Sequence, residues 1–278
     1  MTPYVRPREL REALELRATH PDWMVLAGGT DLMVNANHRA EPAGILDLWR
    51  FPPLGGIRVA GSEVAIGGGV TWSEMERHPV IRARLATLAL AAREIGALQI
   101  QARGTLGGNV GTSSPVGDSL PALLALDAEL EVAGVRGSRR LRYETFCTGY
   151  RKTQLAPDEL IVAAHLRLPD ASTRTMWRKV GTRRAQSISK VMGAASVTLD
   201  GDLVVSARVA LGAVADRPIR VAAVEAAVRG LRMGPEAAEA ARLALRGAIK
   251  PIDDVRSTAS YRHEVAENLV ARFFSLVS

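Results

Sequence analysis

The chain has 278 residues, 47% of them hydrophobic and 23% charged, and a formal net charge of +7. This length allows two or three modest domains, each with its own core. The single cysteine, Cys147, excludes an internal disulfide and any zinc site or iron–sulfur cluster held by cysteines of this chain alone. No apolar run predicts a membrane span, and residues 1–7 lack the apolar core of a secretory signal, so we expect a cytoplasmic protein.

The basic charge does not by itself indicate a nucleic-acid partner. Basic residues are spread along the chain, and aromatic residues make up only 4% of it, without a basic-aromatic stacking pattern. We therefore expect no nucleic-acid partner, and a basic surface that faces solvent, an anionic cofactor or an acidic partner. The five histidines show no metal-binding spacing, so we also expect no metal site.

The N-terminal part of the sequence predicts a small α/β lobe. Helical spacing of apolar residues indicates a helix over 8–18, and a buried strand over 23–27 runs into the turn 28–32 and a short helix. Another strand is predicted at 45–48. The Pro- and Gly-containing segment 51–56 is the first credible linker.

A second lobe follows. Short strands at 57–60 and 63–67 have hairpin spacing, and Thr71 with Glu74 forms the capping-box pattern of a helix start. An Ala/Leu-rich helix is predicted at 84–95. The remaining elements are a helix at 119–126 and strands at 128–132, 139–141 and 160–168.

The C-terminal part predicts three antiparallel strands at 175–180, 194–199 and 203–211, the last two joined by the hairpin signal Asp200-Gly201-Asp202. Helices are predicted at 187–191, 220–229, 235–248 and from about 260 to the end. The fold class is therefore α+β. The predicted domains are 1–52, 53–170 and 171–278.

Two glycine-rich loops, 27–31 and 104–109, carry the chemical signal. Glycine permits positive φ and close approach of another group, and successive exposed N–H groups form a cup for an anion such as a pyrophosphate. Either loop alone could equally be a tight turn. The stretch 103–118 is too rich in Gly and Ser to suggest a core element, and Gly67-Gly68-Gly69 lacks the Rossmann fingerprint, so we interpret it as a strand-to-helix turn.

The segments 25–32, 104–109 and 114–118 resemble the paired FAD-binding motifs in the flavin subunits of the xanthine dehydrogenase and molybdenum hydroxylase family. Further similar segments lie in family order at 149–153, 179–184, 188–191 and 254–262. The resemblance covers almost the whole chain. It implies a two-lobed, PCMH-type FAD-binding domain, with FAD extended between the lobes, followed by the three-stranded sheet with its helices.

The resemblance also implies FAD contacts for specific residues. These are Val25, Leu26, Ala27, Gly28, Gly29, Thr30, Asp31, Leu32, Ile95, Thr105, Leu106, Gly107, Gly108, Asn109, Ser114, Asp118, Ile161 and Lys179. Segment 25–32 is expected to wrap the diphosphate, with Asp31 capping the next helix rather than touching phosphate. Segment 105–109 is expected to form the second phosphate loop, with Leu106 near the isoalloxazine.

Other implied positions lie around the rest of the cofactor. Ser114 and Asp118 are expected at the diphosphate or sugar, and Ile161 on the adenine side. Lys179 matches a family lysine near the polar edge of the flavin, where a cation would raise the flavin potential; its alternative is an exposed strand lysine. Ile95 stands where some relatives have an aromatic residue, which puts stacking there in doubt.

Several conspicuous side chains have plainer interpretations. Trp49, Trp72 and Trp177 are interpreted as packing residues, and Cys147 as a buried small hydrophobe. Tyr150 is expected either to cover the flavin or to pack on the second domain.

The function implied by the resemblance is that of an FAD-dependent oxidoreductase subunit that needs partner chains and holds no catalytic side chain of its own. The expected partners are a large subunit with the molybdenum cofactor and a small subunit with 2Fe-2S clusters, arranged as a dimer of heterotrimers. Neither the organic substrate nor the final electron acceptor can be read from this chain.

Three alternatives remain. One is a redox-inactive binding or assembly module on the same scaffold. Another is the flavin subunit of a carbon monoxide dehydrogenase-type complex, although Thr30-Asp31 does not look like that branch. A nucleic-acid-binding role is a distant third, and a benzoyl-CoA reductase type is disfavoured because its additional cluster needs cysteines.

Overall fold

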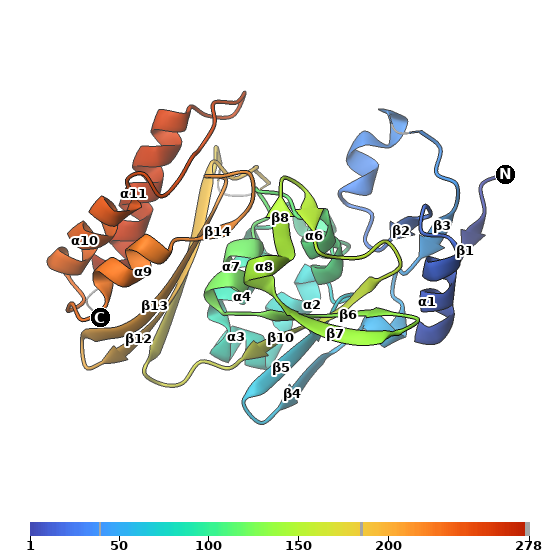
Figure 1. Cartoon of the computed structure of the whole chain (residues 1–278), viewed down its shortest axis with the longest axis horizontal. Helices are drawn as coiled ribbons and strands as arrows, with labels where there is room; N and C mark the ends of the chain where they lie inside the picture. Colours follow the sequence, from blue (N-terminus) through green and yellow to red (C-terminus); the bar gives the residue numbers. More distant parts are fainter. Residues whose placement is uncertain (39, 184–185, 276–278) are drawn as a thin grey trace.

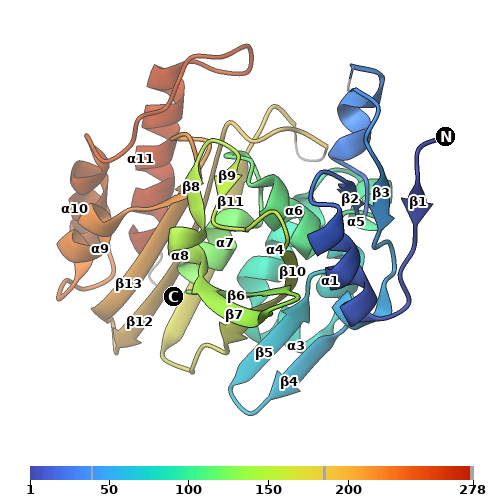
Figure 2. The same cartoon turned by 45° about the vertical axis from the view of Figure 1, so that its right-hand side comes forward.

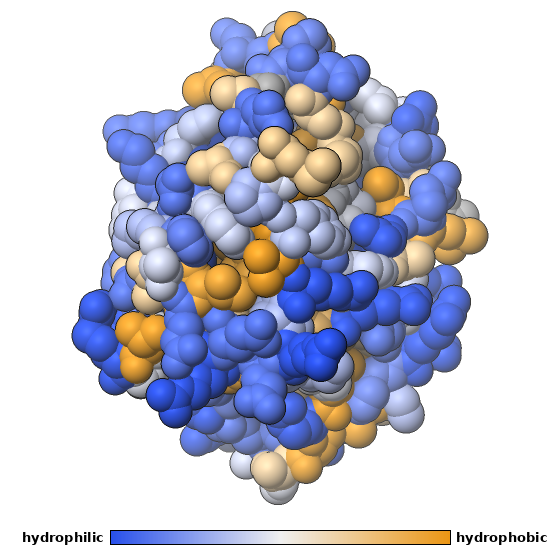
Figure 3. Space-filling model, turned by 90° about the vertical axis from the view of Figure 1, so that its right-hand side faces the viewer, coloured by the Kyte–Doolittle hydropathy of each residue, from blue (hydrophilic) through white to orange (hydrophobic). Residues whose placement is uncertain are grey.

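A computed structural model describes residues 1–38, 40–183 and 186–275. Three main sheets follow one another along the long axis of the molecule, from the N-terminal lobe to the C-terminal helices (Figure 1). No helix in these ranges is long and apolar enough to cross a membrane. The surface at the N-terminal end is largely hydrophilic, with scattered hydrophobic patches (Figure 3).

The first sheet is parallel, with the order β1 (Tyr4–Val5), β3 (Ile45–Asp47) and β2 (Met24–Leu26). Helix α1 (Leu10–Thr19) packs against β3, and the 3₁₀ helix η1 (Leu32–His38) follows β2 through the first glycine turn. The predicted small α/β lobe is therefore present.

The second sheet has five antiparallel strands. Their order is β4 (Ile57–Ala60), β5 (Glu63–Gly67), β10 (Leu160–Arg167), β6 (Glu129–Gly134) and β7 (Gly137–Arg142). The accompanying elements are η2 (Pro52–Leu54), α2 (Trp72–Arg77), α3 (Pro79–Arg84), α4 (Ala86–Glu94), α5 (Leu98–Gln101), α6 (Leu106–Thr112), α7 (Leu120–Ala125), α8 (Tyr143–Phe146), β8 (Cys147–Gly149) and β9 (Lys152–Thr153).

A hydrophobic cluster joins the first two lobes. Ala13 and Leu46 of the first lobe are 0% and 1% exposed, and they share this cluster with Leu160 and Val162 on β10. Burial of this apolar surface holds the first lobe against the five-stranded sheet.

The predicted start of α2 is confirmed in detail. The hydroxyl of Thr71 accepts a hydrogen bond from the Glu74 N–H at 3.3 Å, and the Glu74 carboxylate accepts one from the Thr71 N–H at 2.8 Å. The reciprocal bonds satisfy backbone donors that a helix start leaves free.

The prediction that 103–118 is too glycine-rich for a core element is wrong. Helix α6 lies within it, and its Leu106 and Val110 side chains are fully buried. Packing overrides the low helix propensity of glycine here. The N–H of Gly107 donates to the carbonyl of Gly68 at 2.7 Å, an approach that a side chain at Gly107 would obstruct, since its Cβ would lie 2.8 Å from that oxygen.

The third sheet contains the three predicted strands and one short addition. Its order is β11 (Thr173–Val180), β12 (Val191–Asp200), β13 (Leu203–Gly212) and the two-residue β14 (Ile219–Arg220). The sheet is thus four-stranded rather than three-stranded. Helix α7 contacts β12 and β13, while helices cover the outer face (Figures 1 and 2). These outer helices are α9 (Ala222–Val228), α10 (Pro235–Leu245) and α11 (Ala259–Ser275).

The helix predicted at 187–191 is absent. Residues 187–190 are irregular, and β12 begins at Val191. Ser189 is fully buried, and its hydroxyl donates to the Asp118 carboxylate at 2.5 Å. A tertiary hydrogen bond therefore fixes this segment, which local pattern cannot reveal.

Candidate FAD site

The two glycine-rich segments lie against each other, as the sequence predicts. A Cβ on Gly28 would lie 1.9 Å from the carbonyl oxygen of Arg103, so the backbones are in direct contact. The Nε of Arg103 also donates to the carbonyl of Gly28 at 3.3 Å. The next residue of the turn, Gly29, has φ of +76°, a conformation that favours glycine. Two backbone segments that are 75 residues apart in the sequence are therefore in direct contact at this site.

The first turn keeps its backbone donors available. Within the described part of the chain, the N–H groups of Gly28, Gly29 and Thr30 donate to no protein acceptor. Gly28 is buried while Gly29 and Thr30 are half-buried. Successive unpaired N–H groups in a turn suit a diphosphate, because a buried or half-buried donor needs an acceptor.

The second segment is arranged differently from our expectation. The N–H groups of Leu106 and Gly107 already donate to the carbonyls of Val70 and Gly68, at 3.0 and 2.7 Å. Thr105 is the N-cap of α6 and accepts from the N–H of Gly108 at 3.1 Å. These donors are occupied, so this segment forms a helix start rather than an open phosphate loop.

Two further side chains of α6 are engaged within the protein, which differs from the FAD contacts expected for them. Leu106 is fully buried in the core, so its side chain offers no exposed surface to an isoalloxazine ring. Asn109 accepts a hydrogen bond from the Ser119 hydroxyl through Oδ1 at 2.7 Å. Both contribute first to holding α6 in place.

Asp118 and Lys179 form a buried ion pair. The Lys179 ammonium lies 2.5 Å from Asp118 Oδ2, and their side chains are 3% and 9% exposed. Burial raises the pKa of the Asp118 carboxyl, and the ammonium of Lys179 and the hydroxyl of Ser189 oppose part of that rise. The alternative of an exposed strand lysine is therefore wrong.

The same lysine reaches the end of α4. Its ammonium donates to the carbonyl of Glu94 at 3.1 Å, directly before the half-buried Ile95. The structure therefore brings Ile95, Asp118 and Lys179 together, although they lie far apart in the sequence. Contact of this group with a flavin stays a prediction.

Ile161 and Ser114 lie next to helix α6, on β10 and in the turn that follows the helix. Ile161 is 8% exposed on β10, and its side chain lies beside Gly111 of α6, where an added Cβ would be 3.6 Å away. The Ser114 hydroxyl accepts from the N–H of Val116 at 3.4 Å. Gly68 sits so close to the carbonyl of Ile161 that an added Cβ would lie 2.4 Å from it. The Gly67–Gly69 turn thus also supports the site.

Asp31 links the first turn to the β8–β9 hairpin. Its carboxylate lies 3.5 Å from the guanidinium of Arg151, and η1 starts at the next residue. The helix-capping role predicted for Asp31 remains a prediction. Tyr150, next to Arg151, is 62% exposed, so packing into the second domain is wrong for it.

The packing interpretations of three other residues are confirmed. Trp72 and Trp177 are 2% and 7% exposed, and the indole N–H of Trp177 donates to the carbonyl of Asp118 at 3.1 Å. Cys147 is 7% exposed and accepts from the hydroxyl of Ser113 at 3.0 Å.

Sequence reasoning missed two residues. Arg103 stacks on Trp49, with its guanidinium carbon 3.9 Å from the ring centroid. Ser189 completes the Asp118 cluster. Arg103 could have been found, because it stands directly before the Gly104-Thr105 segment, whereas nothing local marks Ser189.

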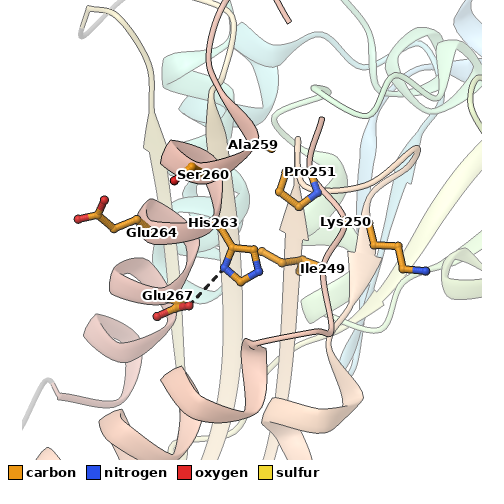
Figure 4. A pocket seen from close by; sticks show the side chains of 8 residues that line it. All are labelled: Ile249, Lys250, Pro251, Ala259, Ser260, His263, Glu264 and Glu267. Atoms are coloured by element: carbon orange, nitrogen blue, oxygen red, sulfur yellow. Dashed lines mark ion pairs between the residues drawn. The ribbon is translucent and has the colours of Figure 1, made fainter. Parts of the chain in front are cut away.

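An open pocket of about 650 Å³ lies elsewhere, in the C-terminal domain (Figure 4). It is formed by residues 249–251 and the start of α11, where His263 Nδ1 lies 3.2 Å from Glu267 Oε1. None of the residues predicted to bind FAD lines it. Over the described ranges, no three His, Cys, Asp or Glu side chains are grouped so as to hold a metal ion.

Comparison with known families identifies the class of protein. The FAD binding domain in molybdopterin dehydrogenase matches residues 1–170, and the CO dehydrogenase flavoprotein C-terminal domain matches residues 177–277. The chain belongs to the family of FAD-binding subunits of the molybdenum hydroxylases, which confirms the family and fold class expected from its motifs.

Named relatives span nearly the whole chain. It is 30% identical to the nicotinate dehydrogenase FAD-subunit of Eubacterium barkeri, covering 98% of this chain and 94% of that one. It is 32% identical to the carbon monoxide dehydrogenase medium chain of Hydrogenophaga pseudoflava, covering 97% and 94%. A solved structure of carbon monoxide dehydrogenase from that organism, lacking the Mo-pyranopterin moiety, aligns with a TM-score of 0.93 at 31% identity, covering 98% and 95%.

Proposed function

We propose that this chain is the FAD-binding electron-transfer subunit of a molybdenum hydroxylase complex. It receives electrons from a 2Fe-2S partner chain and passes them to an external acceptor. One observation carries the assignment of the cofactor site: the three consecutive backbone donors of Gly28, Gly29 and Thr30 have no protein acceptor within the described part of the chain. Bound flavin supplies the chemistry, because it accepts electrons singly and releases them in pairs.

The first turn would hold the FAD diphosphate through these N–H groups. The α6 N-terminus, with its donors engaged, would then act through its positive dipole end and by shaping the site, a weaker contribution than direct hydrogen bonds. Segment 25–32 remains the proposed main phosphate contact, and Thr105 its structural neighbour.

The Asp118–Lys179 pair would form a polar wall beside Ile95. Because Asp118 compensates the ammonium charge at 2.5 Å, Lys179 would shift the flavin potential less than a free cation would. Ile161 and Ser114 keep their proposed places at the adenine and diphosphate portions.

The partners are proposed from the nature of the relatives. Proteins named FAD-subunit, medium subunit and medium chain belong to multi-chain enzymes, which supports a molybdenum-containing large subunit and a 2Fe-2S small subunit. We further propose that the complex is a dimer of heterotrimers and is located in the cytoplasm. Within this chain, the proposed domains are 1–52, 53–170 and 171–278.

A nitrogen heterocycle is the favoured substrate class for the complex. Two relatives are named nicotinate dehydrogenase FAD-subunit and nicotine 6-hydroxylase medium subunit, at 30% and 31% identity. The carbon monoxide dehydrogenase medium chain, at 32%, keeps the second candidate open. The substrate pocket would lie on another chain in either case.

The test is reconstitution of the full chain with FAD. We expect a yellow, non-covalent complex with one FAD per chain, whose flavin is reduced when the native partner chains turn over substrate. A colourless chain that ignores FAD would refute the assignment. A chain that binds FAD but whose flavin stays oxidised during turnover would instead support the redox-inactive module.

A further inference from the structure

Arg103 reaches from the second lobe to the first. It lies two residues after the end of α5 in the second lobe. Its guanidinium carbon is 3.9 Å from the centroid of the Trp49 ring, and its Nε donates to the carbonyl of Gly28 at 3.3 Å. One side chain therefore touches both the segment just after β3 and the glycine turn after β2.

The backbone of Trp49, which presents the ring to Arg103, is anchored on both sides. Its backbone N–H donates to Asp47 Oδ1 at 2.8 Å, and its carbonyl accepts from Arg6 at 2.6 Å. Asp47 is 3% exposed and lies 3.7 Å from the Arg6 guanidinium. Stacking on the ring of this anchored residue favours one position and orientation of the guanidinium.

The main chain of Arg103 makes a second contact with the same turn. Its carbonyl oxygen packs against Gly28, where an added Cβ would be only 1.9 Å away. Two residues later, Thr105 caps α6. Any movement of the Gly28 turn relative to Arg103 would therefore change its distance from the start of α6.

The hydrophobic cluster around Ala13 and Leu46 attaches the first lobe as a whole and reaches Val25 of β2, but it includes none of the turn residues 27–30. The turn itself contains two glycines, which lose much conformational freedom on ordering. A local restraint is needed to keep its free donors aligned.

We propose that Arg103, seated on Trp49, is a positioning residue that fixes the Gly28–Thr30 turn against the start of α6 before the dinucleotide binds. The inference rests on the proposed function for its ligand, but the restraint itself is a property of the chain without FAD. In this role Arg103 acts through the turn, because its Nε donates to the Gly28 carbonyl and its guanidinium plane lies over the Trp49 ring.

The first measurement is FAD affinity of the full, FAD-free chain, by quenching of flavin fluorescence. Arg103→Lys keeps the charge but loses the planar stack, and Trp49→Leu removes the ring. We expect each to raise Kd about 5- to 30-fold, the range of a cation–π contact of moderate strength. The Kd of the double variant is expected to be no higher than that of the weaker-binding single variant, because both changes remove the same stacking contact.

The matched control is Arg50→Lys. Arg50 also lies over the Trp49 ring, at 5.6 Å, but among the described residues the side-chain hydrogen bond to the Gly28 carbonyl comes from Arg103 and not from Arg50. We expect its Kd to stay within about 2-fold of wild type, since the control loses only a weak exposed stack. Thermal unfolding of each variant checks that the fold is retained.

The second measurement tests positioning directly. Nitroxide labels at Val34→Cys and Ser138→Cys report the distance from η1 to β7, because Val34 is 74% exposed, Ser138 is exposed and Cys147 is buried. The N–H of Met33 donates to the Gly29 carbonyl at 2.9 Å, which couples η1 to the turn. We expect a narrow distance distribution without FAD in wild type and a broad one in Arg103→Lys and Trp49→Leu.

Two results would overturn the proposal. One is unchanged FAD affinity in both variants. The other is weakened affinity with a distribution as narrow as that of wild type, which would make Arg103 a direct phosphate contact. If wild type fails to bind FAD, the proposed function falls, while the distance distributions without FAD still decide whether Arg103 restrains the turn.

Discussion

Replacing Gly28 by alanine tests the close contact between the two glycine segments. The added Cβ would lie 1.9 Å from the Arg103 oxygen and 2.6 Å from its carbonyl carbon, whereas real Cβ contacts essentially never fall below 3.0 Å. The backbones must therefore separate by at least about 1.1 Å, the difference between 3.0 and 1.9 Å. Both atoms belong to the main chain, so no flexible side chain can relieve the clash.

Overpacking of this kind costs about 1–3 kcal/mol of unfolding free energy. Moving the turn would also weaken its hydrogen bonds to a charged diphosphate, and each such bond contributes about 1.5–3 kcal/mol, or roughly 10-fold or more in Kd. We expect Gly28→Ala to lower the free energy of unfolding by about 1–3 kcal/mol in urea titrations. In the same preparation, the Kd for FAD should rise at least about 10-fold.

Gly111→Ala provides the matched control for stability. Its Cβ would meet only Ile161 Cδ1, at 3.6 Å, which is an ordinary contact. Because alanine favours the helix, we expect unchanged stability or a gain of up to about 1 kcal/mol. A Gly28→Ala chain as stable as wild type, with unchanged FAD affinity, would refute the close packing of the two segments.

Three further changes test other parts of the site. Asp118→Ala leaves the Lys179 ammonium buried without its partner, so we expect a loss of about 3–5 kcal/mol in denaturant titrations; a loss below 1 kcal/mol would contradict the buried pair. Thr105→Val removes the α6 N-cap acceptor and should cost about 0.5–2 kcal/mol, with the helix-start assignment failing if stability is unchanged. The hydrogen bond from Arg139 lowers the pKa of Glu159, so its stabilisation is present above the ordinary carboxyl pKa and is lost as pH falls through the lowered value. Melting temperatures of Arg139→Gln and wild type should therefore converge in acid, and a gap that widens there would contradict the sign.

Local signals were sufficient for much of the fold. The Thr71–Glu74 pair identified the start of α2 because a capping box involves only neighbouring residues. Asp200-Gly201-Asp202 identified the β12–β13 hairpin, where Gly201 has φ of +61°. Both signals depend on chemistry contained in a few consecutive residues.

The mispredicted segments depend on distant contacts. Helix α6 contains three glycines within seven residues, yet it forms because Leu106 and Val110 are buried in the core. Residues 187–190 were mispredicted as helix because Ser189 bonds with Asp118, 71 positions earlier. Intrinsic propensity is a weak guide where tertiary packing decides.

In the candidate site, too, some features follow from short sequence motifs and others depend on contacts between distant residues. Its motifs located the two glycine segments, and their contact followed from the family resemblance. The occupied donors of Leu106 and Gly107, and the pairing of Lys179 with a carboxylate 61 positions away, depend on the three-dimensional arrangement. A motif identifies which residues gather, but not which of their hydrogen bonds are already made.

The anchoring of Asp118 has a consequence for dissecting the chain. Its carboxylate and carbonyl are held by Trp177, Lys179 and Ser189, all of which lie beyond residue 170. A fragment that stops at 170 would lack all three of these partners of Asp118 and would expose apolar surface that Trp177 normally covers. We therefore expect the stretch that matches the flavin-binding family to be less stable and more prone to aggregate on its own than within the whole chain.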